Sequence, residues 1–367
     1  MVKVSLAKCS TYDTDKVFDA VKRCVDLVGG MEEYVSPGAK VLVKPNLLSA
    51  RLPEEAVDTH PEVVRAVVRL VKKAGATPII GDSPGGYGAD VDEVFEKSGM
   101  RRIAADEGVE LVKFTASRFV DGIPFTRYLF DCAAVISVPK FKTHCLTMMT
   151  AGIKNMYGTV VGLNKVECHS RAPKEADFAK IIAKVYSVAK PHLTVLDGIT
   201  AMEGDGPSGG KARQMGLVMA SADAVAVDAV VAAVVGLSPL EVLITKEAFE
   251  AGLGEADLSR IELTGDSIDS FMVPDFKLPQ TAMFRMIPSG TLNAIAKLIK
   301  FKPFIDAAIC KKCNLCKTTC PVGAIEIGAD FCKIDYNKCV RCLCCHEVCP
   351  YKAISIKRNF LARAVWG

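Results

Sequence analysis

Residues 60–82, HPEVVRAVVRLVKKAGATPIIGD, carry the pattern that decides the fold of most of the chain. The first part repeats valine, leucine and alanine every three or four residues, with charged residues between them, which is typical of an amphipathic helix. TPIIGD follows directly and is a short apolar run closed by a turn signal, as in a buried strand. A helix that leads straight into a buried strand predicts an α/β domain.

The same alternation extends on both sides of this stretch. Further strand-like runs are VKVSLA, KVLVKP, AAVISVP and LTVLDG, which begin at residues 2, 40, 133 and 193. Further helical patterns are DFAKIIAKVYSVAK and SADAVAVDAVVAAVVG, which begin at residues 177 and 221. Because several of the strand runs are apolar throughout, we expect a mostly parallel sheet with helices on both faces, over residues 1–280.

The amino-acid composition excludes some classes of protein. Of the 367 residues, 50% are hydrophobic, 24% charged and 7% aromatic, and the formal net charge is +4. This balance is that of a soluble globular protein, and neither the charge nor the aromatic content favours nucleic-acid binding. The longest apolar stretch contains Asp223 and Asp228, so we expect a core helix there and no transmembrane segment. Without a secretory signal pattern at the start, a cytoplasmic location is predicted.

Polar residues stand where several predicted strands end. Lys44 and Asn46 follow KVLV, Asp82 ends TPIIGD, and Glu203 and Asp205 lie in MEGDGP after LTVLDG. Because parallel strands end at one edge of a sheet, these side chains are candidates for a common ligand site. The alternative is that such glycine-, proline- and aspartate-rich segments only form turns. None of them matches GxGxxG or a P-loop, so a nucleotide site is not supported.

The segment 140–170, KFKTHCLTMMTAGIKNMYGTVVGLNKVECHS, holds two of the chain's five histidines and several lysines among small and apolar residues. His144 and Lys154 are ten residues apart, which is about 15 Å on a continuous helix, so they share a site only if the backbone bends between them. The alternative is a histidine paired with backbone and a solvated lysine. We predict His144, Lys154 and His169 as catalytic residues. The predicted binding residues are Lys44, Asn46, Asp82, Lys142, Asn155, Glu203 and Asp205.

Ten of the fifteen cysteines lie between residues 310 and 349, in CKKCNLCKTTCP from Cys310 and CVRCLCCHEVCP from Cys339. Three cysteines spaced by two residues, then a fourth followed by proline, form the run of bacterial ferredoxins, in which the fourth cysteine binds the other cluster. We therefore expect two [4Fe–4S] clusters. Their ligands would be Cys310, Cys313, Cys316 and Cys349 for the first, and Cys339, Cys342, Cys345 and Cys320 for the second. Zinc, the alternative, fits the two complete repeats less well.

We expect other roles for the remaining residues and segments near the cysteine motifs. Cys332 lies between two short strand patterns and Cys344 beside ligands, so neither is expected to bind metal. His346 is expected at the surface near the second cluster, or alternatively to tune that cluster. Residues 305–358 would form a small α+β ferredoxin-like domain and 359–367 a tail. Residues 281–304 would be a linker with a basic amphipathic helix packed on its own protein, or alternatively on a membrane or partner.

Several of these motifs together resemble a known family. KPN at Lys44, PKFKTHCLTMMTAGIKNMYGTVVG from Pro139, His169, MEGDGP from Met202 and SADAVAVDAV from Ser221 resemble the family catalogued as domain of unknown function 362, whose members often carry a carboxyl-terminal ferredoxin domain. The order of His144, Lys154 and His169 is also similar to that in the amino-terminal domain of nickel-pincer lactate racemases. That second resemblance implies a wall for a cofactor or substrate.

Two functions are consistent with these patterns. In the first, the chain is an iron–sulfur oxidoreductase that exchanges electrons between a soluble partner protein and a small molecule in the large domain. There Lys44, Lys154 and Asn46 would bind an anionic or carbonyl group, one of the two histidines would supply a proton, and Glu203 or Asp205 would orient the ligand. In the second, the chain is an electron-transfer module whose large domain docks a partner. A further organic cofactor is compatible with the first.

Overall fold

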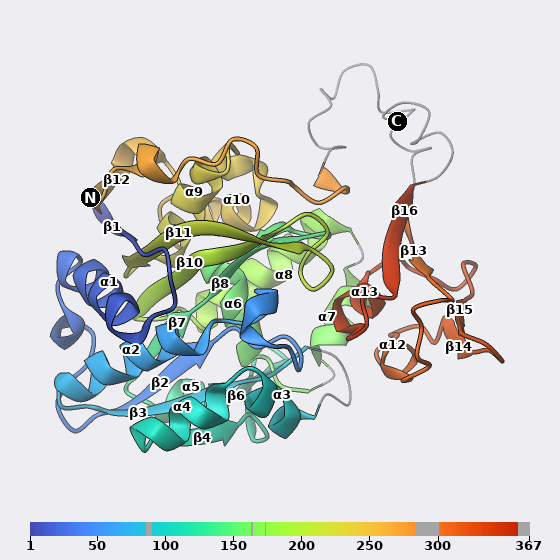
Figure 1. The fold of residues 1–367 in the computed structure, drawn as a ribbon, viewed down its shortest axis with the longest axis horizontal. Helices are drawn as coiled ribbons and strands as arrows, with labels where there is room; N and C mark the ends of the chain where they lie inside the picture. Colours follow the sequence, from blue (N-terminus) through green and yellow to red (C-terminus); the bar gives the residue numbers. More distant parts are fainter. Residues whose placement is uncertain (86–89, 163, 173, 283–300, 359–367) are drawn as a thin grey trace.

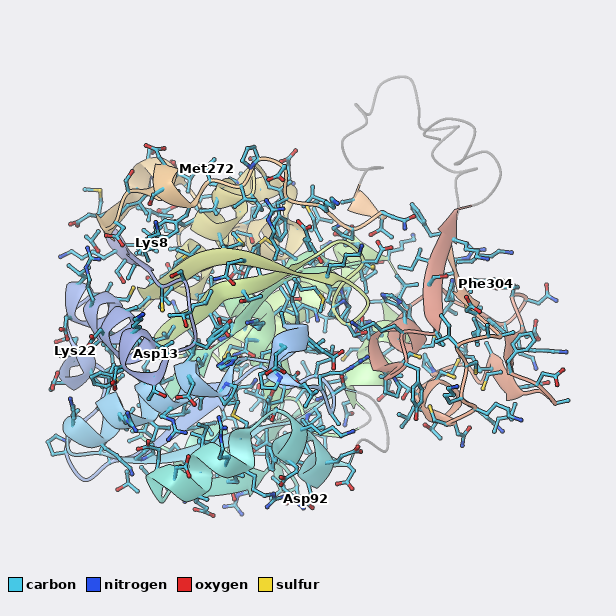
Figure 2. All side chains as sticks on the ribbon, viewed as in Figure 1. Lys8, Asp13, Lys22, Asp92, Met272 and Phe304 are labelled. Carbon is cyan, nitrogen blue, oxygen red and sulfur yellow. The ribbon has the colours of Figure 1, made fainter. Side chains whose placement is uncertain are left out.

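The computed structural model describes residues 1–85, 90–162, 164–172, 174–282 and 301–358. Figure 1 shows a large body built on one twisted sheet and a smaller body, coloured red, that follows it. In Figure 2, Phe304 on the small body lies far from Lys8, Asp13 and Lys22, which lie on the opposite side of the large body. No helix within the described ranges is long and apolar enough to cross a membrane.

The large sheet has the strand order β12-β1-β11-β10-β7-β2-β3-β4, with β8 paired to β10 and β9 paired to β8. Six of its neighbouring pairs are parallel, and three, β1 with β11, β10 with β11 and β8 with β9, are antiparallel. The predicted mostly parallel sheet is therefore confirmed. The strands are β1 Val2–Lys8, β2 Lys40–Pro45, β3 Thr77–Asp82, β4 Glu110–Lys113, β7 Ala134–Val138, β8 Lys140–His144, β9 Met148–Thr150, β10 Leu193–Glu203, β11 Lys211–Ser221 and β12 Ile261–Gly265; a separate hairpin pairs β5 Ser117–Val120 with β6 Ile123–Thr126.

Helices cover both faces of this sheet, as predicted (Figure 1). The alternation along β2 shows how: Val41 and Val43 pack into one hydrophobic core, with α1 and α2, whereas Leu42 packs into the other, with α8, α9 and α10. The helices are α1 Thr14–Leu27, α2 Pro61–Lys73, α3 Val91–Lys97, α4 Met100–Glu107, α5 Tyr128–Asp131, α6 Gly152–Asn155, α7 Asn164–Arg171, α8 Glu175–Val188, α9 Ala224–Val234 and α10 Leu243–Glu250.

One strand is longer than predicted. The run LTVLDG was expected to end near residue 198, but β10 continues to Glu203 and pairs with β11 on the way, with a register shift between Gly198 and Thr200. The expected loop ITAME is therefore strand. Because of this extension, the turn that carries Asp205 lies at the tip of a long hairpin.

The described part of the small body consists of two small two-stranded antiparallel sheets and two short helices. Strand β13 Phe301–Ile305 pairs with β16 Ile354–Arg358, and β14 Ile325–Ile327 pairs with β15 Cys332–Ile334, as the sequence around Cys332 predicts. The helices are α12 Leu315–Thr318 and α13 Cys344–Val348. Strand β13 begins inside the range predicted as linker, while most of the predicted amphipathic helix and the tail 359–367 lie outside the described residues.

Candidate functional site

A small cavity of about 80 Å³ lies where the large body meets the small body. From the large body it is lined by residues at the carboxyl ends of β2 and β3 and by the segment from α6 to α7; from the small body, by residues of α13 and the end of α12. This is the edge at which open α/β sheets bind ligands. Its polar lining residues are Asn46, Asp82, Ser83, Lys154, Asn155, Lys165, His169, Thr319 and Glu347.

A buried ion pair forms the floor of this site. Lys44 Nζ lies 2.6 Å from Asp82 Oδ1, and the two side chains are 0% and 2% exposed. The other oxygen of Asp82 accepts a hydrogen bond from the Leu47 amide at 2.7 Å, and Lys44 Nζ also donates to Asn155 Oδ1 at 3.3 Å. Lys44 and Asp82 thus neutralise each other, and Asn155 ties α6 to the end of β2.

Close approach of the backbone at Gly158 covers this ion pair. A Cβ atom at residue 158 would lie 2.3 Å from Asp82 Oδ1 and 2.5 Å from Lys44 Nζ. Such distances are far below van der Waals contact, so only glycine lets the segment after α6 rest on the pair. Gly158 therefore shapes the site.

Two lysines bring positive charge to the cavity, and they differ in their partners. Lys165 Nζ donates to the Ser83 Oγ at 2.9 Å and to the Pro84 carbonyl at 2.9 Å, and burial lowers the pKa of Lys165 to about 8. Lys154 Nζ has neither a hydrogen bond nor an ion pair with any residue that the structure describes. Burial lowers the pKa of Lys154, and the nearby carboxylate of Glu347 opposes that effect. Lys154 is the cation available to a ligand.

His169 lies on α7 beside Lys154 and Tyr157. Its ring packs against Phe178, with centroids 4.1 Å apart, and the side chain is 4% exposed. Its Nδ1 is buried without a hydrogen-bond partner among the described residues. Burial, followed by the charge of Lys154, lowers the pKa of His169 to about 3, so the ring is neutral near pH 7. A neutral imidazole with an unpaired nitrogen can bind or orient a ligand.

His144 reaches the cavity only through Glu347. Its Nδ1 accepts the Leu146 amide proton at 3.1 Å, so the neutral ring carries its own proton on Nε2. That nitrogen lies 3.3 Å from Oε1 of Glu347, a cavity-lining residue, without the alignment of a hydrogen bond. Burial and then the charge of Lys154 hold the pKa of His144 well below its usual value.

The ten residues predicted from the large body fall into three groups. Those that line the cavity are Asn46, Asp82, Lys154, Asn155 and His169, and those directly behind its wall are Lys44 and His144. The other three contact different parts of the chain: Lys142 Nζ donates to the Val57 carbonyl, Glu203 accepts from the Lys277 amide, and Asp205 accepts twice from Gln280. These last two carboxylates hold the segment that follows η6, Ile268–Phe271, against the hairpin tip.

Two charged residues that line the cavity were not predicted. Lys165 belongs to the segment 140–170, and its position among small residues was a usable signal. Glu347 lies inside the second cysteine motif, where nothing in the spacing distinguishes it from a surface residue. It enters the cavity because α13 packs against the large body.

The predicted cysteine ligands gather into two groups, each around its own small cavity. One cavity is lined by Cys310, Cys313, Cys316 and Cys349 together with Cys332; the other is lined by Cys320, Cys339, Cys342 and Cys345. Within the described ranges, no three or more His, Cys, Asp or Glu residues surround a position for a single metal ion. The thiols of a [4Fe–4S] cluster bind four different iron atoms around a cube, so four thiols around one cavity are compatible with such a cluster.

The segments that carry these cysteines also form the contact with the large body. The prediction that His346 lies at the surface is wrong: it is 4% exposed, with Nε2 3.1 Å from the Asp205 carbonyl oxygen and Nδ1 2.6 Å from that of Ile354. The cause is the long β10–β11 hairpin, whose tip covers α13. A second contact between the bodies comes from Arg51 of the large body, which donates a hydrogen bond to the Cys349 carbonyl oxygen at 2.8 Å.

Comparison with known proteins identifies the family. Residues 41–233, more than half of the chain, match the family described as Domain of unknown function (DUF362). The chain belongs to this family. Its matched region includes every predicted site residue of the large body, from Lys44 to Asp205. The resemblance drawn from the sequence motifs is therefore confirmed for the large body, whereas the match does not extend to the cysteine-rich region.

Two individual proteins are similar to this member of the family. The thylakoid-associated protein sll1697 of Synechocystis sp. is 33% identical over 291 residues, which cover 77% of this chain and 90% of that protein. The lactate racemase apoprotein from Thermoanaerobacterium thermosaccharolyticum has a TM-score of 0.36 and 10% identity, over 61% of this chain and 55% of that enzyme. The second is a weak structural likeness, and the chain spans about half of the racemase's length.

Proposed function

We propose that this family member is an iron–sulfur oxidoreductase that acts on a small anionic molecule bound in the cavity between its two bodies. The observation that carries the proposal is the position of Lys154. Its ammonium group, unpaired among the described residues, lies in a cavity whose opposite wall is α13, the helix that contains Cys345 and leads to Cys349. A ligand held by Lys154 would therefore touch the segment that carries predicted cluster ligands from both sets.

The chemistry of the two bodies is complementary in this proposal. The cysteines of the two groups would hold two [4Fe–4S] clusters, which supply or accept single electrons when bound. The large body supplies binding. Lys154 and Lys165 offer positive charge, and Asn46 Oδ1 and His169 Nδ1 are buried polar atoms with no partner among the described residues. These groups favour an anion that also carries hydrogen-bonding atoms.

The size of the cavity limits the part of the ligand that it holds. A cavity of about 80 Å³ exceeds the roughly 10–15 Å³ that one water needs and is well below the ~300 Å³ of ordinary ligand sites, so it holds only a small group. A carboxylate with an adjacent carbonyl or hydroxyl group is of that size. Proton transfer to such a group falls to Glu347, the only carboxylate from the small body among the described cavity residues, with His144 behind it.

Replacing Lys154 tests the proposal. In Lys154→Met, we expect iron content, visible absorbance and cluster reduction to match the wild type, because Lys154 contacts no predicted cysteine ligand. Turnover, and any small molecule that mass spectrometry finds after anaerobic purification, should be lost. Lys246→Met, an exposed lysine on α10, is the matched control. A Lys154→Met protein that keeps its ligand, or loses its iron, would contradict the proposed site.

The alternative proposal is an electron-transfer module that docks a partner protein. Its supporting observation is that Cys313, a predicted ligand of the first cluster, is exposed. In that case partner-dependent electron transfer should survive in Lys154→Met, and no organic molecule should be retained. For either function we propose a soluble electron donor or acceptor protein as partner and a cytoplasmic location.

A further inference from the structure

A second, larger cavity lies beside the candidate site. Its volume is about 500 Å³, and it lies between the 49–55 segment, α3 and the loops of the small body around Leu315 and Tyr351. Gly85 and Val348 line both this outer cavity and the inner one. The two cavities are therefore neighbours that share part of one wall, and both lie on the boundary between the bodies.

The charged groups of the outer cavity are already paired. Arg51 lies 2.9 Å from Glu55, and Lys97 lies 2.9 Å from Glu93. Asp90 accepts hydrogen bonds from the first amides of α3. The rest of the lining is largely apolar. It consists of Ala50, Leu52, Gly85, Val94, Leu315, Val348, Pro350 and Tyr351, together with Ser49 and the predicted cluster ligand Cys313. In contrast with the inner cavity, the described lining here offers no unpaired cation to an anionic group.

We infer that the two cavities together bind one organic anion, whose acidic head lies at Lys154 and whose long, mainly apolar body fills the outer cavity. This inference rests on the proposed function, because that places the anionic group in the inner cavity, and it adds the class of ligand. An inner space of about 80 Å³ fits only the head. A space of about 500 Å³ lies within the usual 300–1,000 Å³ of sites for organic ligands.

The arrangement also explains why the small body forms one side of both cavities. In the chain, Val348 lies between Glu347, which lines the inner cavity, and Pro350, which lines the outer one. A ligand that extends from the inner cavity into the outer one past Val348 therefore lies along the cysteine-bearing segment. Its head is the part closest to Lys154, His169 and Glu347.

Straight-chain carboxylates test this inference. We would titrate acetate, butanoate, hexanoate, octanoate and decanoate into the full-length protein, purified anaerobically, and follow binding by calorimetry. Each added CH₂ beyond butanoate should raise the affinity roughly two- to fourfold, as expected for burial of apolar surface. Heptylammonium, which has the same alkyl tail as octanoate and the opposite charge, should not bind.

Two variants distinguish the contribution of the ligand's acidic head to affinity from that of its apolar tail. Lys154→Met should weaken binding of every acid at least tenfold. Leu52→Gln, at a side chain 57% exposed and therefore tolerant of change, should weaken octanoate and decanoate several-fold and leave acetate unchanged. Leu258→Gln, at another exposed leucine, is the control.

Each failure has a distinct meaning. Equal affinity for all chain lengths, still dependent on Lys154, would overturn the two-cavity ligand and leave the inner site in place. Octanoate binding that Lys154→Met does not change would also overturn the inference, because the outer cavity would then act alone. Absence of binding by every acid would contradict both the inference and the anionic site.

Discussion

Nε2 of His144 lies 3.3 Å from Oε1 of Glu347, and this contact joins the large body to the small one. Both side chains are buried. The Leu146 amide occupies Nδ1 of the histidine, so the proton of the neutral ring is on the nitrogen that faces the carboxylate. Because Glu347 also lines the inner cavity, a proton on either residue lies one contact away from a bound ligand.

We predict that His144→Gln keeps its iron and loses activity. Glutamine can still accept the Leu146 amide proton, but it cannot exchange a proton with Glu347. Turnover should fall about a hundredfold to ten-thousandfold, the range for lost acid–base assistance, and its pH profile should change shape. His192→Gln is a close control, since His192 Nδ1 also accepts a backbone amide proton at 3.1 Å, but far from the cavity. Equal turnover in both variants would exclude a role for His144.

We predict that Gly158→Ala is severely destabilising. The new methyl group would meet Asp82 Oδ1 at 2.3 Å, so either the ion pair with Lys44 or the segment after α6 must move. Disrupting a buried ion pair costs about 3–5 kcal/mol of unfolding free energy. Gly162→Ala is the control. Its φ of +72° strains alanine, but apart from its chain neighbours no described residue comes within 4 Å of the Cβ position, so a loss of about 1–2 kcal/mol is expected there. Chemical denaturation of both variants measures their loss of unfolding free energy. Equal losses would show that contact with the ion pair is unimportant.

Much of the large body could be predicted from the sequence, and the reason is visible at the floor of the site. Lys44 and Asp82 end neighbouring parallel strands, so the rule that such ends share an edge is enough to bring them together. The condition that the backbone must bend between His144 and Lys154 is met in the structure, because the β8–β9 hairpin and the start of α6 lie between them. Local pattern and sheet topology suffice for these residues.

Other parts depend on how the two bodies dock, which no local pattern encodes. Glu347 and Cys344 enter the cavity, and His346 becomes buried, only because α13 packs against the hairpin tip. Glu203 and Asp205 were expected at the cavity because LTVLDG looked complete. Pairing with β11 instead extends β10 by five residues beyond Gly198, and this places Glu203 and Asp205 outside the lining of the cavity.

The cysteine groups give a prediction that separates ligands from a bystander. The anaerobically prepared protein should contain about eight iron atoms per chain. Cys320→Ser and Cys349→Ser should each damage one cluster, the second and the first respectively, and remove up to about four iron atoms. Cys332→Ala should keep all of them, although Cys332 lines the same cavity as the first set.

Iron and sulfide analysis, with paramagnetic resonance of the reduced variants, measures this outcome. Loss of iron in Cys332→Ala with retention in Cys349→Ser would show that Cys332 replaces Cys349 as a ligand. Stoichiometric zinc in the wild type would contradict the cluster assignment itself.

The last prediction concerns Asp228, which positions the helix that carries Lys154. Asp228 lies on α9, is 2% exposed, and its Oδ1 accepts the Gly152 amide proton at 2.6 Å at the start of α6. Burial raises the pKa of Asp228 to about 8, even though the two backbone amides favour its charged form. A carboxyl group with a raised pKa contributes most to stability below its unfolded pKa near 4, and loses that contribution as pH rises to about 8.

We therefore expect the wild type to lose stability relative to Asp228→Asn between pH 6 and 8, by about 1.4 kcal/mol per pH unit, because asparagine keeps an acceptor for Gly152 but does not titrate. Urea denaturation of both proteins at several pH values, with iron content checked at each, measures the difference. Relative to Asp228→Asn, the wild type should be more stable at pH 6 than at pH 8. The difference in unfolding free energy between the two proteins should stop changing above about pH 8. Parallel stability curves across this range would show that Asp228 is ionised throughout and that α6 is held by a charged carboxylate.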